Sequence, residues 1–481
     1  MSGLSRQLRF VSLLAVALFI AGVGRVADAQ VHVWADAPGG NNGTTWTDAY
    51  TSLSNAIVSS VDGVEVWVAA GSHTPGLLEG DKFVIGSRKL YGGFDGTETA
   101  RDQRDVTANV TILEGWLGTT NSSTIVSGGG FVLDGFTIQN VGQKSPESGN
   151  GAVRVDSAGV SNRIANCRFM NNGSYTAGAL YLGRNGTFNY IENCIFSTNY
   201  AVQNGAVYIW GDDSQNVFSN CVFEGNVSGQ RAAGVRISGS NSTNLFQSCV
   251  FTSNTCGQLG GAIFSFADET TYNRYDDCEF YENVSGGGVL FASQAGTRDD
   301  FYNCIFKGNQ NAIQIQNTGA VVTVVNSVFY SNRVDAAVYV KDGAAYITNS
   351  IFWANEGSVR DIEMDNSTCT VTIAYSILFT NAPNVVANGG TINWGPGIIS
   401  SDPLFADPAA GDFHLRSVFG RWTGSGWVID AVTSPGLDAG DPSHEYREEA
   451  APDGRRINIG RWGNRPESSR SEPTPTLIFL Y

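Results

Sequence analysis

The chain has 481 residues, of which 58 are glycine and only 3 are methionine, and its formal net charge is −16. That length exceeds a usual single domain, so the chain is either multidomain or a repeat architecture, and its composition favours turns and strands over helices. The acidic balance argues against a nucleic-acid partner, which needs a basic stripe, and against an anionic membrane surface.

The first 29 residues (1–29) are predicted to be a cleaved export signal. Two arginines precede the apolar run FVSLLAVALFIAGVG (10–24), and the A-x-A site ADA (27–29) follows it. The run is short for a membrane span, and no later segment reaches about 20 apolar residues. We therefore expect a secreted or cell-surface protein whose mature form begins near Gln30 and has no transmembrane span; an uncleaved anchor is the alternative.

Residues 30–62 are predicted to cover the N-terminal end of the fold. Within TWTDAYTSLSNAIVSSV (45–61), apolar side chains recur at helical spacing, including Trp46, Leu53 and Ile57. A helix there would shield the first strands, whose edges are otherwise sticky. The strand VEVWVAAG (64–71) would then start the first coil.

A repeat occupies most of the segment 63–400. Motifs such as NCRFMNN (166–172) and NSIFWAN (349–355) recur at steps of 23 to 29 residues. A second motif, as in GAVRV (151–155), has apolar residues at its third and fifth positions, and a third short strand, as in FNYIE (188–192), precedes each Asn-Cys. Three strands per coil predict an all-β fold, a right-handed parallel β-helix of about 10–12 coils with an N-terminal capping helix.

Side chains that recur once per coil should line up in columns. The inward cysteines are predicted to remain free buried thiols, because in-register neighbours point their Cβ atoms alike and suit a disulfide badly. The phenylalanine two residues later should form an aromatic ladder. The motif's last asparagine, Asn172 and its equivalents, should adopt left-handed φ and bond coil to coil. We interpret all three columns as structural.

Past residue 400 the repeat fades into a Pro-, Gly- and Asp-rich region. We expect an irregular last coil and a C-terminal cap over 401–468, followed by a flexible tail over 469–481.

Several strings carry a resemblance to known proteins: WTDAYTSLSNAI, VEVWVAAGSHTP, GGFDGTETARDQRD (92–105), DPLFADPAAGDFHL, SPGLDAGDP and INIGRWGN. Over almost the whole mature length the chain resembles a large bacterial family of exported right-handed β-helix proteins with a pectin-lyase-like fold. Its F-x-x-N motifs and GGAI (260–263) are also similar to repeats of polymorphic outer-membrane proteins, which are surface adhesins. The resemblance implies fold and export, but the family includes lyases, hydrolases and non-catalytic surface proteins, so it leaves function open.

The outward positions of the second strand are the candidate binding surface. They read Arg154, Tyr181, Tyr208, Arg236, Phe264, Leu290, Gln314 and Tyr339, and two residues further Asp156, Gly183, Trp210, Ser238, Phe266, Ala292, Gln316 and Lys341. We define the aromatic strip as Arg154, Tyr181, Tyr208, Trp210, Arg236, Phe264 and Phe266, and predict that it is exposed. Sugar rings stack their apolar faces on aromatic side chains, and arginine binds carboxylate or sulfate. The alternative is that these side chains only stabilise a sheet face.

The sequence offers only isolated candidates for catalytic residues. Arg236 is a candidate base for a lyase, and Asp212 and Asp213 are candidate acids for a hydrolase, although acids at coil corners are expected to be merely solvated. All four histidines (32, 73, 414, 444) lie outside the repeats, so the strip has no histidine acid or base. No spacing of metal ligands is evident and no cofactor is expected, except Ca²⁺ if the protein is a lyase.

The sequence therefore favours a secreted or cell-surface β-helix that binds a polysaccharide or another surface component, adhesin-like and without catalysis. The alternative is a polysaccharide lyase or glycoside hydrolase acting on a glycan, including a uronate, in the same groove. A purely structural filament is a third reading.

Overall fold

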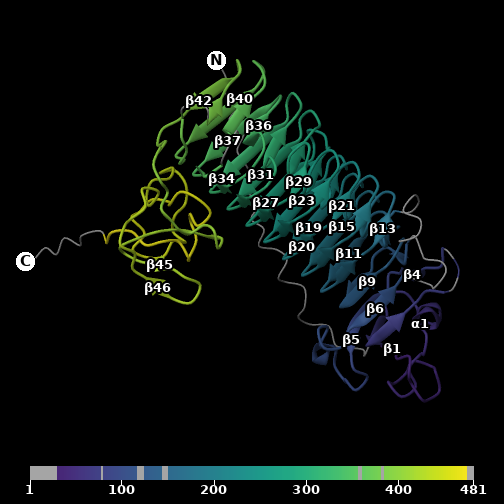
Figure 1. The fold of residues 1–481 in the computed structure, drawn as a ribbon. Helices are drawn as coiled ribbons and strands as arrows, with labels where there is room; N and C mark the ends of the chain where they lie inside the picture. Colours follow the sequence, from purple (N-terminus) through teal and green to yellow (C-terminus); the bar gives the residue numbers. More distant parts are fainter. Residues whose placement is uncertain are drawn as a thin grey trace, which may run out of the picture.

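The computed structural model describes residues 30–76, 78, 80–115, 124–142, 150–355, 360–380 and 384–473. Its strands stack coil on coil along one axis, from α1 (Leu53–Ser59) at one end to β42 (Thr391–Trp394) at the other (Figure 1). The predicted signal 1–29 and the residues after 473 lie outside the described part of the chain.

Three long parallel sheets of 14, 12 and 11 strands form the walls of the solenoid, in agreement with the predicted three strands per coil. Sheet A consists of β1 (Val31–Val33), β2 (Glu65–Ala69), β5 (Lys89–Phe94), β8 (Val132–Asp134), β11 (Ser161–Ala165), β15 (Phe188–Glu192), β19 (Gln215–Ser219), β23 (Thr243–Gln247), β27 (Tyr272–Asp276), β31 (Arg298–Tyr302), β34 (Val321–Val325), β37 (Ala344–Thr348), β40 (Thr370–Ala374) and β42. Sheet B consists of β3 (Gly71–His73), β6 (Thr111–Glu114), β9 (Phe136–Gln139), β12 (Arg168–Met170), β16 (Ile195–Ser197), β20 (Val222–Glu224), β24 (Val250–Thr252), β28 (Glu279–Tyr281), β32 (Ile305–Lys307), β35 (Val328–Tyr330) and β38 (Ile351–Trp353).

Sheet C carries the second motif of each coil. It consists of β4 (Phe83–Gly86), β7 (Val126–Gly128), β10 (Val153–Val155), β14 (Leu180–Leu182), β18 (Val207–Ile209), β22 (Val235–Ile237), β26 (Ile263–Ser265), β30 (Leu290–Ala292), β33 (Ile313–Ile315), β36 (Ala336–Val340), β39 (Arg360–Met364) and β41 (Val385–Val386). A short fourth sheet lies in the turns, made of β13 (Gly173–Ser174), β17 (Tyr200–Ala201), β21 (Val227–Ser228), β25 (Thr255–Cys256) and β29 (Val284–Ser285). The remaining elements are the 3₁₀ turn η1 (Arg101–Gln103) and the antiparallel pairs β43 (Phe405–Asp407) with β44 (Asp412–Leu415) and β45 (Arg421–Trp422) with β46 (Trp427–Val428).

The predicted N-terminal helix is present as α1. Ser52 caps it, its side chain accepting a hydrogen bond from the backbone N–H of Asn55, and Leu53, Ala56 and Ile57 are buried in the main core. Residues before the helix also join the solenoid, because β1 pairs in parallel with β2 as the first strand of sheet A. The first coil therefore has both a paired edge and an apolar cover.

The inward columns confirm most of the structural predictions. All eight cysteines are free and buried. The phenylalanines from Phe169 to Phe352 stack face to face, with ring centroids 4.5–5.0 Å apart between neighbouring coils. Such columns bury apolar surface continuously along the axis, so each coil stabilises its neighbours.

The asparagine column bonds coil to coil as predicted, but its backbone prediction was wrong. From Asn172 to Asn355, each side-chain amide donates to the next asparagine's Oδ1 at 2.9–3.2 Å. The left-handed residue lies one position earlier, as at Asn171 (φ 54°) and Thr198 (φ 52°). That earlier residue makes the turn, which leaves the asparagine side chain free to point inward and bond its neighbours.

Residues 401–468 were predicted to form an irregular last coil and a cap, and residues 469–481 a flexible tail. The described residues 401–473 are here called the C-terminal region. They pack against the side of the solenoid, beside sheet B (Figure 1). Outward apolar side chains of sheet B, such as Ile305, Val328 and Ile351, form one buried cluster with Phe405 and Phe413. Because these strands carry apolar residues on both faces, sheet B needs a cover on this side.

Candidate functional site

The aromatic strip lies where the repeat places it, on the outer face of sheet C. Arg154, Tyr181, Tyr208, Arg236 and Phe264 occupy one register position on β10, β14, β18, β22 and β26. Their side chains contact in sequence, as shown by the Tyr181 and Tyr208 rings, whose centroids are 5.7 Å apart. The structure therefore brings the predicted residues together.

The prediction that the whole strip is exposed was wrong. Tyr208, Arg236 and Phe264 are only 5 %, 7 % and 2 % exposed, whereas Trp210 and Phe266 are 50 % and 38 % exposed. Phe264 is buried in a cluster with Ala232 and Phe291, against which Leu259 also packs. The accessible surface is consequently made by the second column, with Tyr181 and Arg154 half-buried beside it.

The prediction that Leu290 and Ala292 face outward on β30 was wrong. Leu290 faces the core and is fully buried, as is Ala292, and Phe291 takes the outward position. Phe291 pairs in register with Phe264 and Gln314, and its ring stacks on that of Phe264 at 5.5 Å. Residues 289–292 are all apolar, so the alternation of inward and outward residues cannot be read from the sequence there. The predicted register was therefore shifted by one residue.

Arg236 is the centre of a cation–π cluster on this face. Its guanidinium lies 5.0 Å from the Tyr208 ring centroid and 5.6 and 5.8 Å from those of Phe264 and Phe266. Its Nε donates to the Ser238 hydroxyl at 3.0 Å and its Nη1 to the Asn204 amide oxygen, both neutral partners. Burial lowers the pKa of Arg236 below its ordinary value. Arg236 thus fixes the positions of the surrounding rings.

Three other charged residues near the strip, Arg154, Asp212 and Asp213, already have partners. Arg154 forms an ion pair with Asp156 at 2.6 Å. Asp212 Oδ1 accepts the backbone N–H of Ser240 at 2.8 Å, and Asp213 Oδ1 accepts the side-chain amide of Asn241 at 2.6 Å. Both aspartates therefore bond one coil to the next at a corner, which is a structural use of these candidate acids.

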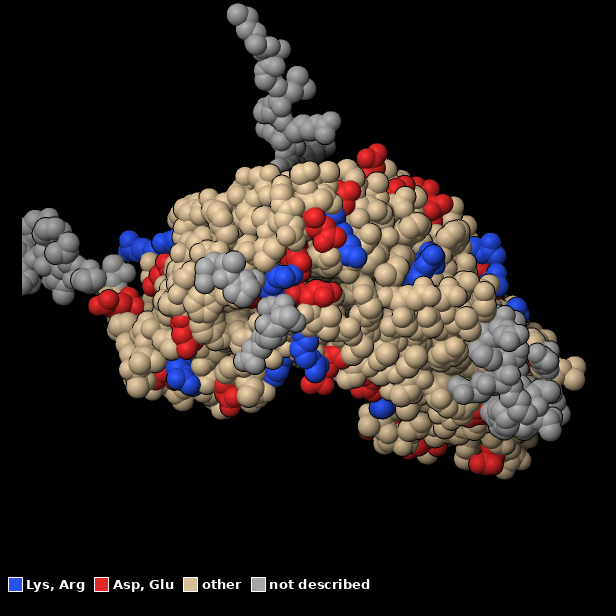
Figure 2. All heavy atoms as spheres, turned by 45° about the horizontal axis from the view of Figure 1, so that its top comes forward, with Lys and Arg blue, Asp and Glu red and all other residues tan. Residues whose placement is uncertain are grey.

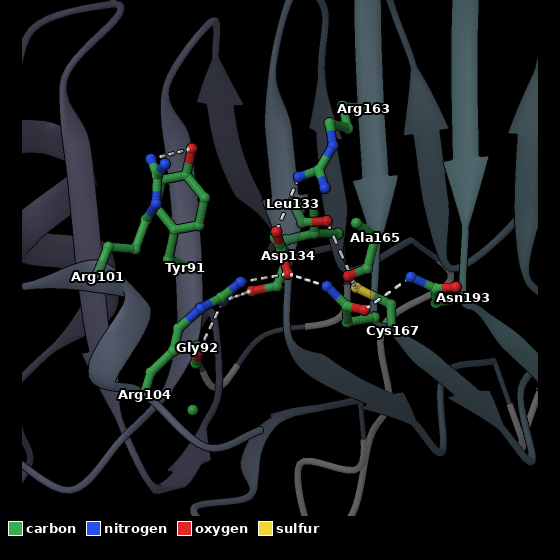
Figure 3. Close-up of polar contacts among 12 residues, drawn as sticks. Tyr91, Gly92, Arg101, Arg104, Leu133, Asp134, Arg163, Ala165, Cys167 and Asn193 are labelled. Carbon is green, nitrogen blue, oxygen red and sulfur yellow. Dashed lines mark hydrogen bonds and ion pairs between the residues drawn. The ribbon is translucent and has the colours of Figure 1, made fainter. Parts of the chain in front are cut away.

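A cluster of charged and polar residues joins Arg104, which belongs to the string 92–105, to Asp134 on β8. Asp134 accepts from Arg104 at 2.7 Å, from Arg163 at 2.8 Å and from Asn166 at 2.8 Å (Figure 3). Burial opposes ionisation, but these hydrogen bonds and the charge of Arg104 outweigh it and hold the pKa of Asp134 below its ordinary value. The carboxylate is saturated with donors, so the cluster fastens the loop carrying Arg104 to the solenoid.

Within the described ranges, no group of three or more His, Cys, Asp or Glu side chains is arranged to hold a metal ion. No helix in the described part of the chain combines the length and apolarity needed to cross a bilayer. On the face shown in Figure 2, acidic and basic side chains are interspersed, with wide uncharged areas between them.

Sequence reasoning missed one site, a cleft between sheet B and the C-terminal region. His414 and Trp462 line it from one side and Glu279 from the other. His414 lies outside the repeats in the sequence, yet the chain folds back and brings it into one cleft with Glu279 of β28. The neighbouring Asp412, two residues away on the same strand, was the available signal, since an Asp-x-His pair on a strand places both side chains on one face.

Two family models match parts of this chain. A family model described as a right-handed β-helix region matches residues 121–298, and one described as disaggregatase related matches residues 276–440. The first match confirms the predicted right-handed parallel β-helix. No curated protein matches the chain.

Solved structures similar to this chain share little sequence with it. The pectin methylesterase from Aspergillus niger is 16% identical, with a TM-score of 0.35, over 64% of this chain and 86% of that one. The catalytic domain of Agl-KA is 12% identical (TM-score 0.40, 71% and 64% covered), and the pectate lyase Pel9A is 12% identical (TM-score 0.33, 90% and 97% covered). Likeness at this level carries no weight for activity.

Proposed function

We propose that this protein is exported and binds a polysaccharide along the outer face of sheet C, with Trp210 and Phe266 as the stacking surfaces. One observation carries the proposal: each exposed ring is backed by a buried one. Trp210 lies against Tyr208 and Phe266 against Phe264, both at 5.8 Å between ring centroids. Paired rings hold each other in place, so the exposed rings lose little freedom when a ligand binds.

The two platforms lie in line along the solenoid. Trp210 and Phe266 follow equivalent register positions on β18 and β26, two coils apart. At ~4.8 Å per coil, they are separated by about 10 Å along the axis. The small side chain of Ser238, which is half-buried, occupies the coil between them. A linear polysaccharide laid along the axis therefore meets two aromatic faces in succession.

Polar groups near the platforms suit a sugar chain. The half-buried Arg154 and the exposed Arg231, whose guanidinium is 5.8 Å from the Phe264 ring centroid, carry hydrogen-bond donors for hydroxyl or acidic groups. Asp212 and Asp213 are engaged between coils, and Arg236 is enclosed by rings. These engagements favour binding over catalysis at this face.

The proposed setting is the cell exterior, as a secreted or surface-held protein. The basic and apolar N-terminal segment with its A-x-A site supports export. In that setting a polysaccharide or another cell-surface component is the proposed partner, and the role is adhesin-like.

The test uses the mature protein, a panel of insoluble polysaccharides and two variants. Retention should fall about tenfold when Trp210→Ala and Phe266→Ala are combined, because two stacking contacts are lost. Tyr346→Ala is the matched control, since Tyr346 is 46% exposed on β37 of sheet A, a different face. Equal retention by the double variant would refute the proposal. New reducing ends or unsaturated products in the supernatant, lost in the double variant, would instead assign lyase or hydrolase activity to this face.

A further inference from the structure

The cleft between sheet B and the C-terminal region has the size of a small-ligand site. Its volume is about 610 Å³, and its walls include Val250 and Glu279 from the solenoid and His414, Trp422, Trp462 and Glu467 from the C-terminal region. Ligand pockets in proteins span roughly 300–1,000 Å³. The walls are fixed relative to each other by the buried apolar cluster that docks the C-terminal region.

Most charged groups around this cleft neutralise one another in pairs, and the half-buried Glu467 is the exception. Arg461 bonds Glu279 at 2.8 Å, and Arg465 bonds Asp277. On the opposite wall, Arg421 bonds Asp412 at 3.2 Å. Pairing of these charges disfavours a strongly charged ligand, because such a ligand would have to displace an existing ion pair.

The His414 ring is hydrogen-bonded through Nδ1, whereas its Nε2 has no hydrogen-bond partner. Its Nδ1 donates to Asp412 Oδ1 at 2.6 Å, and the ring stacks on Trp462 with centroids 4.1 Å apart. Burial raises the pKa of Asp412, but the hydrogen bonds from His414 and the charge of Arg421 outweigh burial and keep this pKa below its ordinary value. The Asp412 carboxylate is therefore ionised and only accepts hydrogen bonds. In the neutral ring this leaves a lone pair on Nε2. That atom is buried and has no partner, and His414 is only 7% exposed.

Trp462, which stacks on His414, has an unpaired donor where His414 has an unpaired acceptor. Trp462 Nε1 is also buried without a hydrogen-bond partner, and an indole N–H only donates. A buried polar atom left unpaired destabilises the fold, so both atoms gain from a partner. A hydroxyl group is able both to accept from an indole N–H and to donate to an imidazole nitrogen.

We propose that this cleft binds an uncharged, hydroxyl-rich ligand of sugar or polyol type. Its hydroxyls bond His414 Nε2 and Trp462 Nε1, and its apolar ring face lies against the partly exposed Trp422. The site is separate from the aromatic strip, since it lies on sheet B and is completed by the C-terminal region. It does not depend on polysaccharide binding at sheet C.

Cellobiose and maltose are suitable probes, titrated into the mature protein and followed calorimetrically. Saturable binding of either disaccharide is expected, about tenfold weaker in Trp422→Ala. Binding should be unchanged in Trp394→Ala, a control on β42 at the far end of sheet A, and in the combined Trp210→Ala and Phe266→Ala variant, which separates this site from the strip.

A crystal grown with the disaccharide gives the second readout. The expected result is a ligand hydroxyl within hydrogen-bond distance of His414 Nε2 or Trp462 Nε1. Failure of both disaccharides to bind saturably, wild-type affinity in Trp422→Ala, or ordered water alone on both atoms would overturn the proposal.

Discussion

Replacing Asp299 with asparagine should make the stability of the central coils less dependent on pH. An inner row of asparagines runs through sheet A, each side-chain amide donating to the next coil, and Asp299 ends it by accepting from Asn273 at 3.0 Å. The Tyr275 hydroxyl also donates to it at 3.3 Å, but Oδ2 is buried without a partner. Burial, only partly offset by these hydrogen bonds, raises the pKa of Asp299 to about 7.

The sign and size of the effect follow from that pKa. Between pH 4 and 7 the folded protein keeps a proton on Asp299 that the unfolded chain has released, so stability falls as pH rises. With the pKa raised from 3.8 to about 7, the loss is at most about 4 kcal/mol, of which about 2–3 kcal/mol falls between pH 5 and pH 8. An asparagine side chain at this position would keep the acceptor oxygen and the shape, and would not ionise.

Hydrogen exchange followed by mass spectrometry measures this locally. Opening free energies of peptides covering β27 and β31 should drop between pH 5 and pH 8 in the wild type, and should drop about 2–3 kcal/mol less in Asp299→Asn. Glu269→Gln is the matched control, because Glu269 is exposed just before β27. Identical pH dependence in the wild type and Asp299→Asn would refute the reasoning, as would an equal change in the control.

Three further predictions concern the core and the clusters around it. A thiol reagent should find no reactive cysteine in the native protein and eight after denaturation; fewer than eight would reveal a disulfide. Phe223→Ala should cost about 3–5 kcal/mol in urea unfolding, because Phe223 is fully buried between two stacked rings; a loss below about 1 kcal/mol would mean that the column collapses around the gap. Asp134→Asn should cost about 3 kcal/mol at pH 7 by leaving Arg104 unpaired. Because the pKa of Asp134 is lowered, this stabilisation is present above about pH 4 and is lost progressively as the pH falls below it, and a thermal-unfolding difference as large at pH 2 as at pH 7 would contradict that assignment.

Periodicity explains why the solenoid was predictable from sequence. A residue such as Cys167 or Phe169 recurs once per coil, and in-register stacking turns that recurrence into a column whether it lies inside or outside. The same rule placed Tyr181, Tyr208 and Arg236 side by side on sheet C. It could not predict their exposure, because burial on an outer face depends on how neighbouring side chains lie over one another.

The C-terminal region shows where sequence reasoning ends. It has no repeat, so nothing in its pattern says which surface it contacts. The outward apolar residues Ile305, Val328 and Ile351 were visible as a second apolar position in their strands, and a sheet apolar on both faces predicts a cover. His414 reaches the cleft beside β28 only because the C-terminal region docks there and because of the side-chain geometry at the contact. The sequence pattern contains neither kind of information.

The role of the sheet C face is tested most directly at Trp210 itself. The indole N–H signal of Trp210, identified by its absence in Trp210→Phe, is followed by NMR while an oligosaccharide cut from the retained polysaccharide is added. A shift that saturates together with binding is the predicted result. A Trp210 signal that stays in place while the protein becomes fully bound would contradict the account.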